Sequence, residues 1–188
     1  RQAVCYLSQY GFSDRLSQAI AHGIGKADAQ VQLVDLRATD PQELTALVGD
    51  AKAVVVPTWP AEPDGELQAS IGTLLAALQP KQLVGVYDAF GGNDEPIDAV
   101  AEQLRNQGLK PAFEPLRIRQ LPQGGDYQRC EESGTDLGQI LTRKKSIEAL
   151  RSIDANLDKA LGRLTGGLYI VTASQGEGDA RRSGAMVA

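Results

Sequence analysis

The sequence contains few of the residues that most often build catalytic and metal sites. Its 188 residues include one histidine, two cysteines and one tryptophan, and aromatic residues make up only 5%. The cysteines, Cys5 and Cys130, are far apart and form no CxxC spacing, which favours two reduced, intracellular thiols. His22 falls near the end of a predicted helix, away from the strand ends where a Ser-His-Asp triad would need it. These residues also do not supply a zinc or di-iron site within the chain.

The sequence also lacks a basic excess and long hydrophobic runs. It has 24 acidic and 19 basic residues, giving a net charge of −5, so we expect no nucleic-acid partner. No apolar run is long enough to cross a bilayer, and no signal peptide precedes the first predicted strand. We therefore expect a cytoplasmic protein without a membrane span. Both ends of the chain look cut, which suggests a part of a longer polypeptide.

Short apolar runs alternate with segments of helical periodicity along most of the chain. This pattern is typical of a parallel sheet that is covered by helices on both faces. Five such β-α units predict an α/β fold, namely a flavodoxin-like doubly wound five-stranded parallel sheet with strand order 2-1-3-4-5. The predicted strands are Ala3–Leu7, Val31–Leu36, Ala53–Val56, Leu83–Tyr87 and Leu116–Ile118.

The composition changes after Thr142. A final helix of the sheet domain is expected from Asp126, and the charge run 143–145 follows it. A new amphipathic helix with Ile153 and Leu157 on its apolar stripe comes next, and a strand is expected at Leu168–Ala173. We therefore predict a flavodoxin-like domain at residues 1–143, a linker at 144–154 and an incomplete second domain at 155–188.

The turn after the first strand is the strongest candidate for ligand binding. It joins a strand to a helix N-terminus, where free backbone N–H groups and the helix dipole favour an anion. It is neither a Walker A loop nor a GxGxxG fingerprint, which argues against ATP, GTP and NAD and favours a phosphate monoester. A plain serine-capped turn is the alternative interpretation. The residues of this turn are Ser8, Gln9, Tyr10, Gly11, Phe12 and Ser13.

Two further loops are expected at the same edge of the sheet. Pro57, Thr58 and Trp59 follow the third strand, and in this fold the loops after strands one and three flank the ligand crevice. Trp59 could form a flat platform for a planar ring, or it could fold down onto the protein. After the fourth strand come Phe90, Gly91 and Gly92, where Phe90 could press on a ring and the glycines allow close approach.

These segments together resemble a known family. The segments 7–14, 56–59 and 90–96 are similar to the three flavin loops of the flavodoxin-like domain in flavodiiron proteins. Residues 160–173 are similar to the opening of flavin reductase domains. The order of the two parts resembles the cyanobacterial diflavin type of flavodiiron protein, and the resemblance covers essentially the whole chain.

The resemblance implies an FMN electron-transfer module within an oxidoreductase that reduces oxygen to water. Electrons would come from NAD(P)H or another donor, and a di-iron centre and a second flavin would lie in parts outside this chain. The implied partner is the di-iron domain of the same or another subunit in a homo- or hetero-oligomer. The residues of the first loop would hold the phosphate of FMN, and those of the other two loops would flank its ring.

Two positions depart from the usual flavodoxin pattern. Phe12 stands where most flavodoxins have asparagine, and Gly92 stands where many have an aromatic residue. They motivate an alternative, a flavodoxin-like scaffold that has lost FMN and serves in subunit contact or regulation. A response-regulator receiver shares the strand order but needs an acidic cluster where Ser8 and Pro57 stand.

Overall fold

The computed structural model describes residues 1–91, 96–118 and 121–164. The chain divides into two units, Arg1–Thr142 and Arg143–Ala188. In the first unit, five parallel strands form one sheet in the order β2-β1-β3-β4-β5, which confirms the predicted flavodoxin-like α/β fold. The strands are β1 (Gln2–Tyr6), β2 (Val31–Asp35), β3 (Ala53–Pro57), β4 (Leu83–Tyr87) and β5 (Lys110–Pro111).

The central strands end together at one edge of the sheet. Every residue of β3 is buried, as expected for a strand that is covered on both faces. In the strand register, Tyr6 lies beside Asp35 and Pro57 lies beside Tyr87. The loops that follow β1, β3 and β4 therefore leave the sheet at the same edge, where the topology of a doubly wound sheet places a ligand.

The fifth strand differs from its prediction. We expected it at Leu116–Ile118, but β5 consists of Lys110 and Pro111, and Leu116 only forms an isolated bridge with Tyr87. The chain leaves the ladder between these two points. Pro111 and Pro115 lack the N–H that a continuous ladder needs, which explains the interruption.

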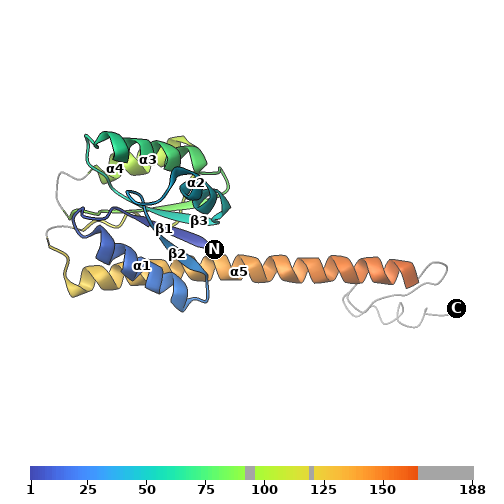
Figure 1. Cartoon of the computed structure of the whole chain (residues 1–188). Helices are drawn as coiled ribbons and strands as arrows, with labels where there is room; N and C mark the ends of the chain where they lie inside the picture. Colours follow the sequence, from blue (N-terminus) through green and yellow to red (C-terminus); the bar gives the residue numbers. More distant parts are fainter. Residues whose placement is uncertain (92–95, 119–120, 165–188) are drawn as a thin grey trace. The chain divides into compact units, whose positions relative to one another are not determined.

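Helices cover both faces of the sheet in the first unit. Figure 1 shows α2, α3 and α4 on one face, with α1 and the first part of α5 on the other. The carboxylates of Asp40 and Asp64 cap α2 and α3 by accepting hydrogen bonds from the amides of Gln42 and Leu67. The helices are α1 (Ser13–Lys26), α2 (Pro41–Asp50), α3 (Gly65–Ala77), α4 (Ile97–Asn106) and α5 (Gly124–Leu164).

Two apolar clusters fill the space between the sheet and these helices. The first includes Val54 and Val56 of β3 and packs against α2, α3 and α4. The second includes Val55 of β3 and Tyr87 of β4 and packs against α1 and α5. The alternation of side chains along β3 therefore divides the core between the two faces of the sheet.

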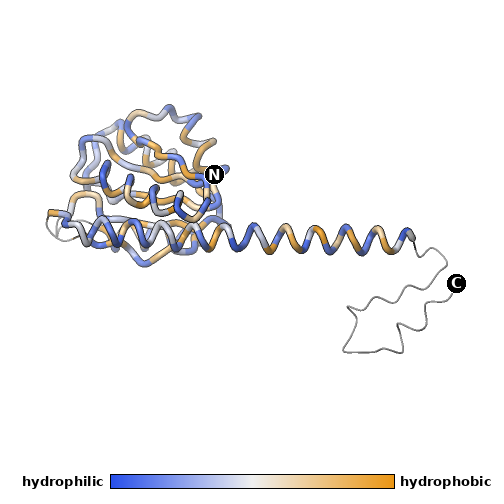
Figure 2. Tube along the Cα trace, turned by 90° about the horizontal axis from the view of Figure 1, so that it is seen from below, coloured by the Kyte–Doolittle hydropathy of each residue, from blue (hydrophilic) through white to orange (hydrophobic). Residues whose placement is uncertain are grey.

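One continuous helix occupies the region where two helices and a linker were predicted. The predicted linker 144–154 is helical and lies within α5. On the part of α5 in the second unit, Ile147, Leu150, Ile153 and Leu157 are exposed, and Figure 2 shows hydrophobic and hydrophilic residues alternating there. The domain division at 143 and 155 remains a prediction, and the expected strand Leu168–Ala173 lies outside the described residues. Within the described part of the chain, no helix is both long and apolar enough to span a membrane.

Candidate functional site

The loop after β1, residues 8–13, is called the first loop, and its backbone has an unusual conformation. Gln9 and Gly11 have positive φ angles of 59° and 53°, while Tyr10 between them does not. Left-handed backbone in a turn can direct neighbouring N–H groups toward one concave side, an arrangement that binds anions. Among the residues that the structure describes, the amides of Gln9 and Gly11 have no hydrogen-bond partner. The loop thus offers main-chain donors to an anion.

The first loop is packed tightly against the loop after β4. A Cβ atom added to Gly11 would lie 2.5 Å from the carbonyl oxygen of Ala89 and 2.6 Å from Cα of Phe90. The amide of Phe12 donates a hydrogen bond of 2.7 Å to the same Ala89 carbonyl. Glycine was expected at position 11 to admit a ligand, but its first role in this structure is to admit the neighbouring loop.

Ser13 is turned away from the concave side of the first loop. Its side chain is fully buried, and its Oγ accepts a hydrogen bond of 2.9 Å from the amide of Leu7. The same Oγ lies 3.1 Å from the hydroxyl of Tyr87. The predicted contact between the Ser13 hydroxyl and a phosphate therefore has no support in this arrangement, in which the hydroxyl closes the base of the loop.

Acidic groups lie close to the first loop. The amide of Ser8 donates to Oδ1 of Asp35 at 3.4 Å, and the amide of Arg37 donates to the same oxygen at 3.0 Å. Burial, together with the charges of Asp35 and Asp14, raises the pKa of Tyr6 above its usual value. These carboxylates oppose an anion, so any phosphate here would depend on main-chain donors and the dipole of α1.

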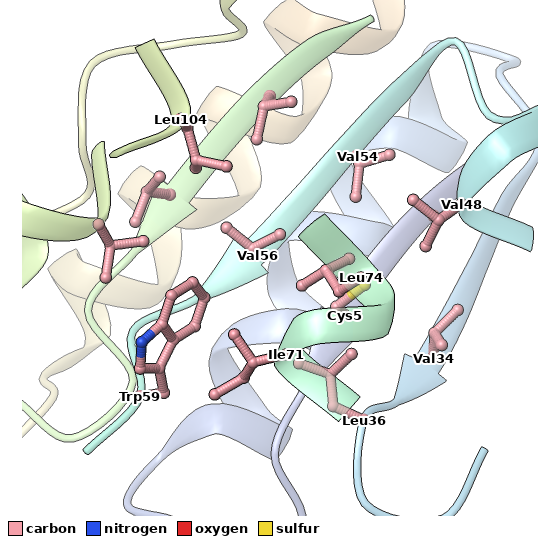
Figure 3. Close-up of a cluster of buried hydrophobic side chains, with 14 of the residues drawn as sticks. Cys5, Val34, Leu36, Val48, Val54, Val56, Trp59, Ile71, Leu74 and Leu104 are labelled. Atoms are coloured by element: carbon pink, nitrogen blue, oxygen red, sulfur yellow. The ribbon is translucent and has the colours of Figure 1, made fainter. Parts of the chain in front are cut away.

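The second loop points inward. Pro57 and Thr58 are buried, and Trp59 is only 9% exposed. Figure 3 shows the ring of Trp59 beside Val56 and Ile71 in the apolar cluster between the sheet and α3. In this structure Trp59 is folded onto the protein and is not open to solvent, while its contact with a flavin stays a prediction.

The exposed aromatic group belongs to the third loop. Phe90 is 51% exposed, and its ring lies 5.4 Å from the ring of Tyr10, centroid to centroid, at an interplanar angle of 44°. Gly91 has a φ of 78°, and its amide donates to Oδ1 of Asp88 at 3.3 Å. The third loop therefore presents Phe90 beside the first loop. Gly92 lies outside the described residues.

For three residues at the end of β4 and the start of the third loop, the sequence analysis predicted no role in the site. Tyr87 and Asp88 are buried, at 0% and 4% exposure. The main chain of Ala89 forms hydrogen bonds with both neighbouring loops. A tyrosine and an aspartate at the end of an otherwise aliphatic strand were the available signal. Ala89 offers no signal in the sequence, because its main chain makes the contacts.

A cavity and a surface histidine lie elsewhere in the first unit. A cavity of about 210 Å³ lies between α4 and residues 109–117, and it contains none of the predicted site residues. His22 lies on the surface, where its Nδ1 is 3.2 Å from Glu131. In the described ranges, no three histidine, cysteine or acidic side chains are grouped so that they could hold a metal ion.

The comparisons with known proteins agree with the fold. The flavodoxin family model matches residues 4–134. Diflavin flavoprotein A 1 of Synechocystis sp. is 48% identical over 174 residues, which are 93% of this chain and 30% of that protein. The chain thus spans less than a third of the length of this relative.

Two solved structures are similar to this chain in fold. The flavodoxin-like domain of a Synechococcus sp. protein superposes with a TM-score of 0.77 at 49% identity, covering 81% of this chain and 99% of that one. The flavodiiron core of Flv1 from Synechocystis sp. PCC 6803 gives a TM-score of 0.67 at 31% identity, covering 76% of this chain and 36% of that one. The chain belongs to the flavodoxin family, and it resembles the flavodoxin-like domains of cyanobacterial diflavin and flavodiiron proteins.

Proposed function

We propose that this chain binds FMN at the edge formed by its first and third loops and relays electrons within a flavodiiron oxidoreductase. The observation that carries the proposal is the first loop, in which Gln9 and Gly11 both have left-handed backbone and their amides have no hydrogen-bond partner among the described residues. Such a loop at the N-terminus of a helix suits a phosphate monoester. Membership of the flavodoxin family supports the same ligand.

The residues present fit FMN in a different way from the sequence prediction. The amides of the first loop would hold the phosphate, and Phe90 with Tyr10 would cover the flavin ring. Pro57, Thr58 and Trp59 would support the loops from below rather than touch the ring. Bound FMN would supply the electron-carrying chemistry, while the protein supplies binding and orientation. Since Phe90 is half exposed, the ring would remain near the surface, where an electron donor or acceptor can approach.

The wider reaction is also part of the proposal. The names of the relatives, a diflavin flavoprotein and a flavodiiron core, support a protein in which a di-iron centre and a second flavin lie outside this chain. We infer oxygen reduction to water with electrons from NAD(P)H or another donor. The partner would be a di-iron domain of the same or another subunit in a homo- or hetero-oligomer.

A titration of the purified chain with FMN tests the binding step. We expect a shift of the flavin absorbance, quenching of flavin fluorescence and a higher melting temperature, because a ligand of the folded state stabilises it. Riboflavin is the matched control, since it lacks the phosphate and should bind more weakly. Saturating FMN without a spectral shift or a change in melting temperature would contradict the proposal.

One observation favours the second candidate, a scaffold without a flavin. The amides of Ser8, Phe12 and Ser13 already bond to groups of the protein, and the carboxylates of Asp35 and Asp14 lie near the loop. A scaffold needs no free anion site. Stoichiometric and reversible FMN binding by the intact protein would eliminate this candidate.

A further inference from the structure

The main chain of Ala89 joins all three loops. Its amide donates a hydrogen bond of 2.9 Å to Oγ1 of Thr58 in the second loop. Its carbonyl accepts a hydrogen bond of 2.7 Å from the amide of Phe12 in the first loop. Ala89 is fully buried, so neither bond competes with bulk water. The main chain of this one residue thus fixes the spacing between the three segments.

Thr58 contributes to this junction through both its main chain and its side chain. Its amide donates to the carbonyl of Tyr87 at 2.9 Å, which continues the pairing between β3 and β4 by one residue. Its hydroxyl oxygen accepts a hydrogen bond from the amide of Ala89, two residues beyond Tyr87. The side chain is fully buried. Loss of the hydroxyl would leave the buried Ala89 amide unpaired, which is more costly than loss of an exposed hydrogen bond.

Tyr87 fixes the base of the first loop in a comparable way. Its hydroxyl donates its single proton to the carbonyl of Cys5 at 2.8 Å. In the hydrogen bond between the hydroxyls of Tyr87 and Ser13, Ser13 is therefore the donor. The amide of Leu7 in turn donates to Oγ of Ser13. This chain of hydrogen bonds ties both ends of the first loop to β4. Burial raises the pKa of Tyr87 well above its usual value, so its hydroxyl keeps its proton.

We infer that Thr58 and Tyr87 are positioning residues, which hold the three loops in their binding shape before the ligand arrives. The inference rests on the proposed FMN function but concerns groups that need not touch FMN. Thr58 acts through Ala89 on the loop that carries Phe90, and Tyr87 acts through Ser13 on the loop that carries the amides of Gln9 and Gly11. A site that is ordered in advance binds more tightly, because less conformational freedom is lost on binding.

The variant Thr58→Val tests the first residue, since valine keeps the shape and removes the hydroxyl. We expect the dissociation constant for FMN to rise about tenfold, as for the loss of one buried hydrogen bond, and the Ala89 amide to exchange faster with solvent in the cofactor-free chain. Thr58→Ser keeps the hydroxyl and should restore both values. Thr73→Val is the matched control, because the Thr73 hydroxyl is exposed and bonds only within α3.

The variant Tyr87→Phe tests the second residue. We expect weaker FMN binding and faster exchange of the Leu7 amide, with Tyr127→Phe on α5 as the control.

A role limited to global stability would lower the melting temperature and leave the dissociation constant of the folded chain unchanged. An FMN affinity within twofold of wild type in both variants, with unchanged exchange at Ala89 and Leu7, would overturn the inference. If wild type itself does not bind FMN, the proposed function fails, whereas the exchange measurements still test whether these residues order the loops.

Discussion

Gly23 of α1 lies directly against the main chain of Glu131 in α5: a Cβ atom added to Gly23 would be 1.9 Å from the carbonyl oxygen of Glu131. Gly134 has the same relationship to Ile20, whose carbonyl oxygen would be 2.1 Å from an added Cβ. The two helices therefore pack with their backbones in contact. The site depends on this packing, since α1 begins at the first loop.

The variant Gly23→Ala should destabilise the fold, because the backbone of α5 cannot move aside as a flexible side chain could. We expect the free energy of unfolding to fall by about 3 kcal/mol, at the upper end of the range for overpacked positions. Gly25→Ala on the same helix is the control, since nothing lies within 4 Å of its added Cβ. That variant should gain up to about 1 kcal/mol from helix propensity. Urea unfolding that is followed by the fluorescence of the single tryptophan measures both, and equal stabilities would contradict the packing described.

Glu131 should make the pairing of α1 and α5 sensitive to acid. Its carboxylate pairs with Lys26 and His22, and these hydrogen bonds lower its pKa below the ordinary value of 4.5. A lowered pKa in the folded state gives a stabilisation that is present above pH 4.5 and is lost as the pH falls through the folded-state value. The variant Glu131→Gln should therefore lose stability near pH 7 and show a smaller further loss on acidification. Unfolding curves between about pH 3 and pH 7 test this, and identical pH profiles of the two proteins would refute it.

Phe90→Ala should weaken FMN binding without unfolding the protein. The side chain is half exposed, so its removal should change the free energy of unfolding by no more than about 0.5 kcal/mol. Loss of its aromatic contact with the flavin ring should raise the dissociation constant about tenfold, equal to about 1.4 kcal/mol. Flavin fluorescence titration measures the binding, and an unaltered affinity would show that Phe90 does not cover the ring.

Trp59→Ala, in contrast to Phe90→Ala, should mainly lower the stability of the fold. Because Trp59 is 9% exposed and lies in the apolar cluster, its truncation should cost about 3 to 5 kcal/mol of stability. Trp59→Phe, which keeps an aromatic ring in the cluster, should lose less. Thermal unfolding by circular dichroism is the suitable measurement, since these variants lack the fluorescent reporter. A stable Trp59→Ala protein that fails to bind FMN would instead support a direct contact between Trp59 and the flavin.

The sequence was sufficient for the sheet and for the location of the three loops. Strands such as β3 and β4 are continuous apolar runs between helical segments, and their burial on both faces makes that signal strong. The signal was weaker at β5, where prolines interrupt the pairing. It failed at α5, because the apolar stripe breaks at the charge run 143–145 while arginine and lysine remain good helix formers.

The directions of the site side chains could not be predicted in the same way. Alternation along β3 assigns Val54 and Val56 to one face, but the strand ends at Pro57, so the alternation does not extend to Trp59. The roles of Ser13 and Gly11 depend on a neighbouring loop that is more than 70 residues away in the sequence. Such contacts arise from tertiary packing, which no local pattern reports.

The interrupted outer strand also bears on how the molecule behaves among copies of itself. An exposed strand at the edge of a sheet offers unpaired backbone groups to which another chain can add a strand, and this is a common route to aggregation. Here the edge beside β4 carries a two-residue strand, Lys110 and Pro111, followed by Pro115. A charged side chain and two residues without an N–H make this border a poor template, so the same irregularity that shortens the sheet helps to keep neighbouring molecules apart.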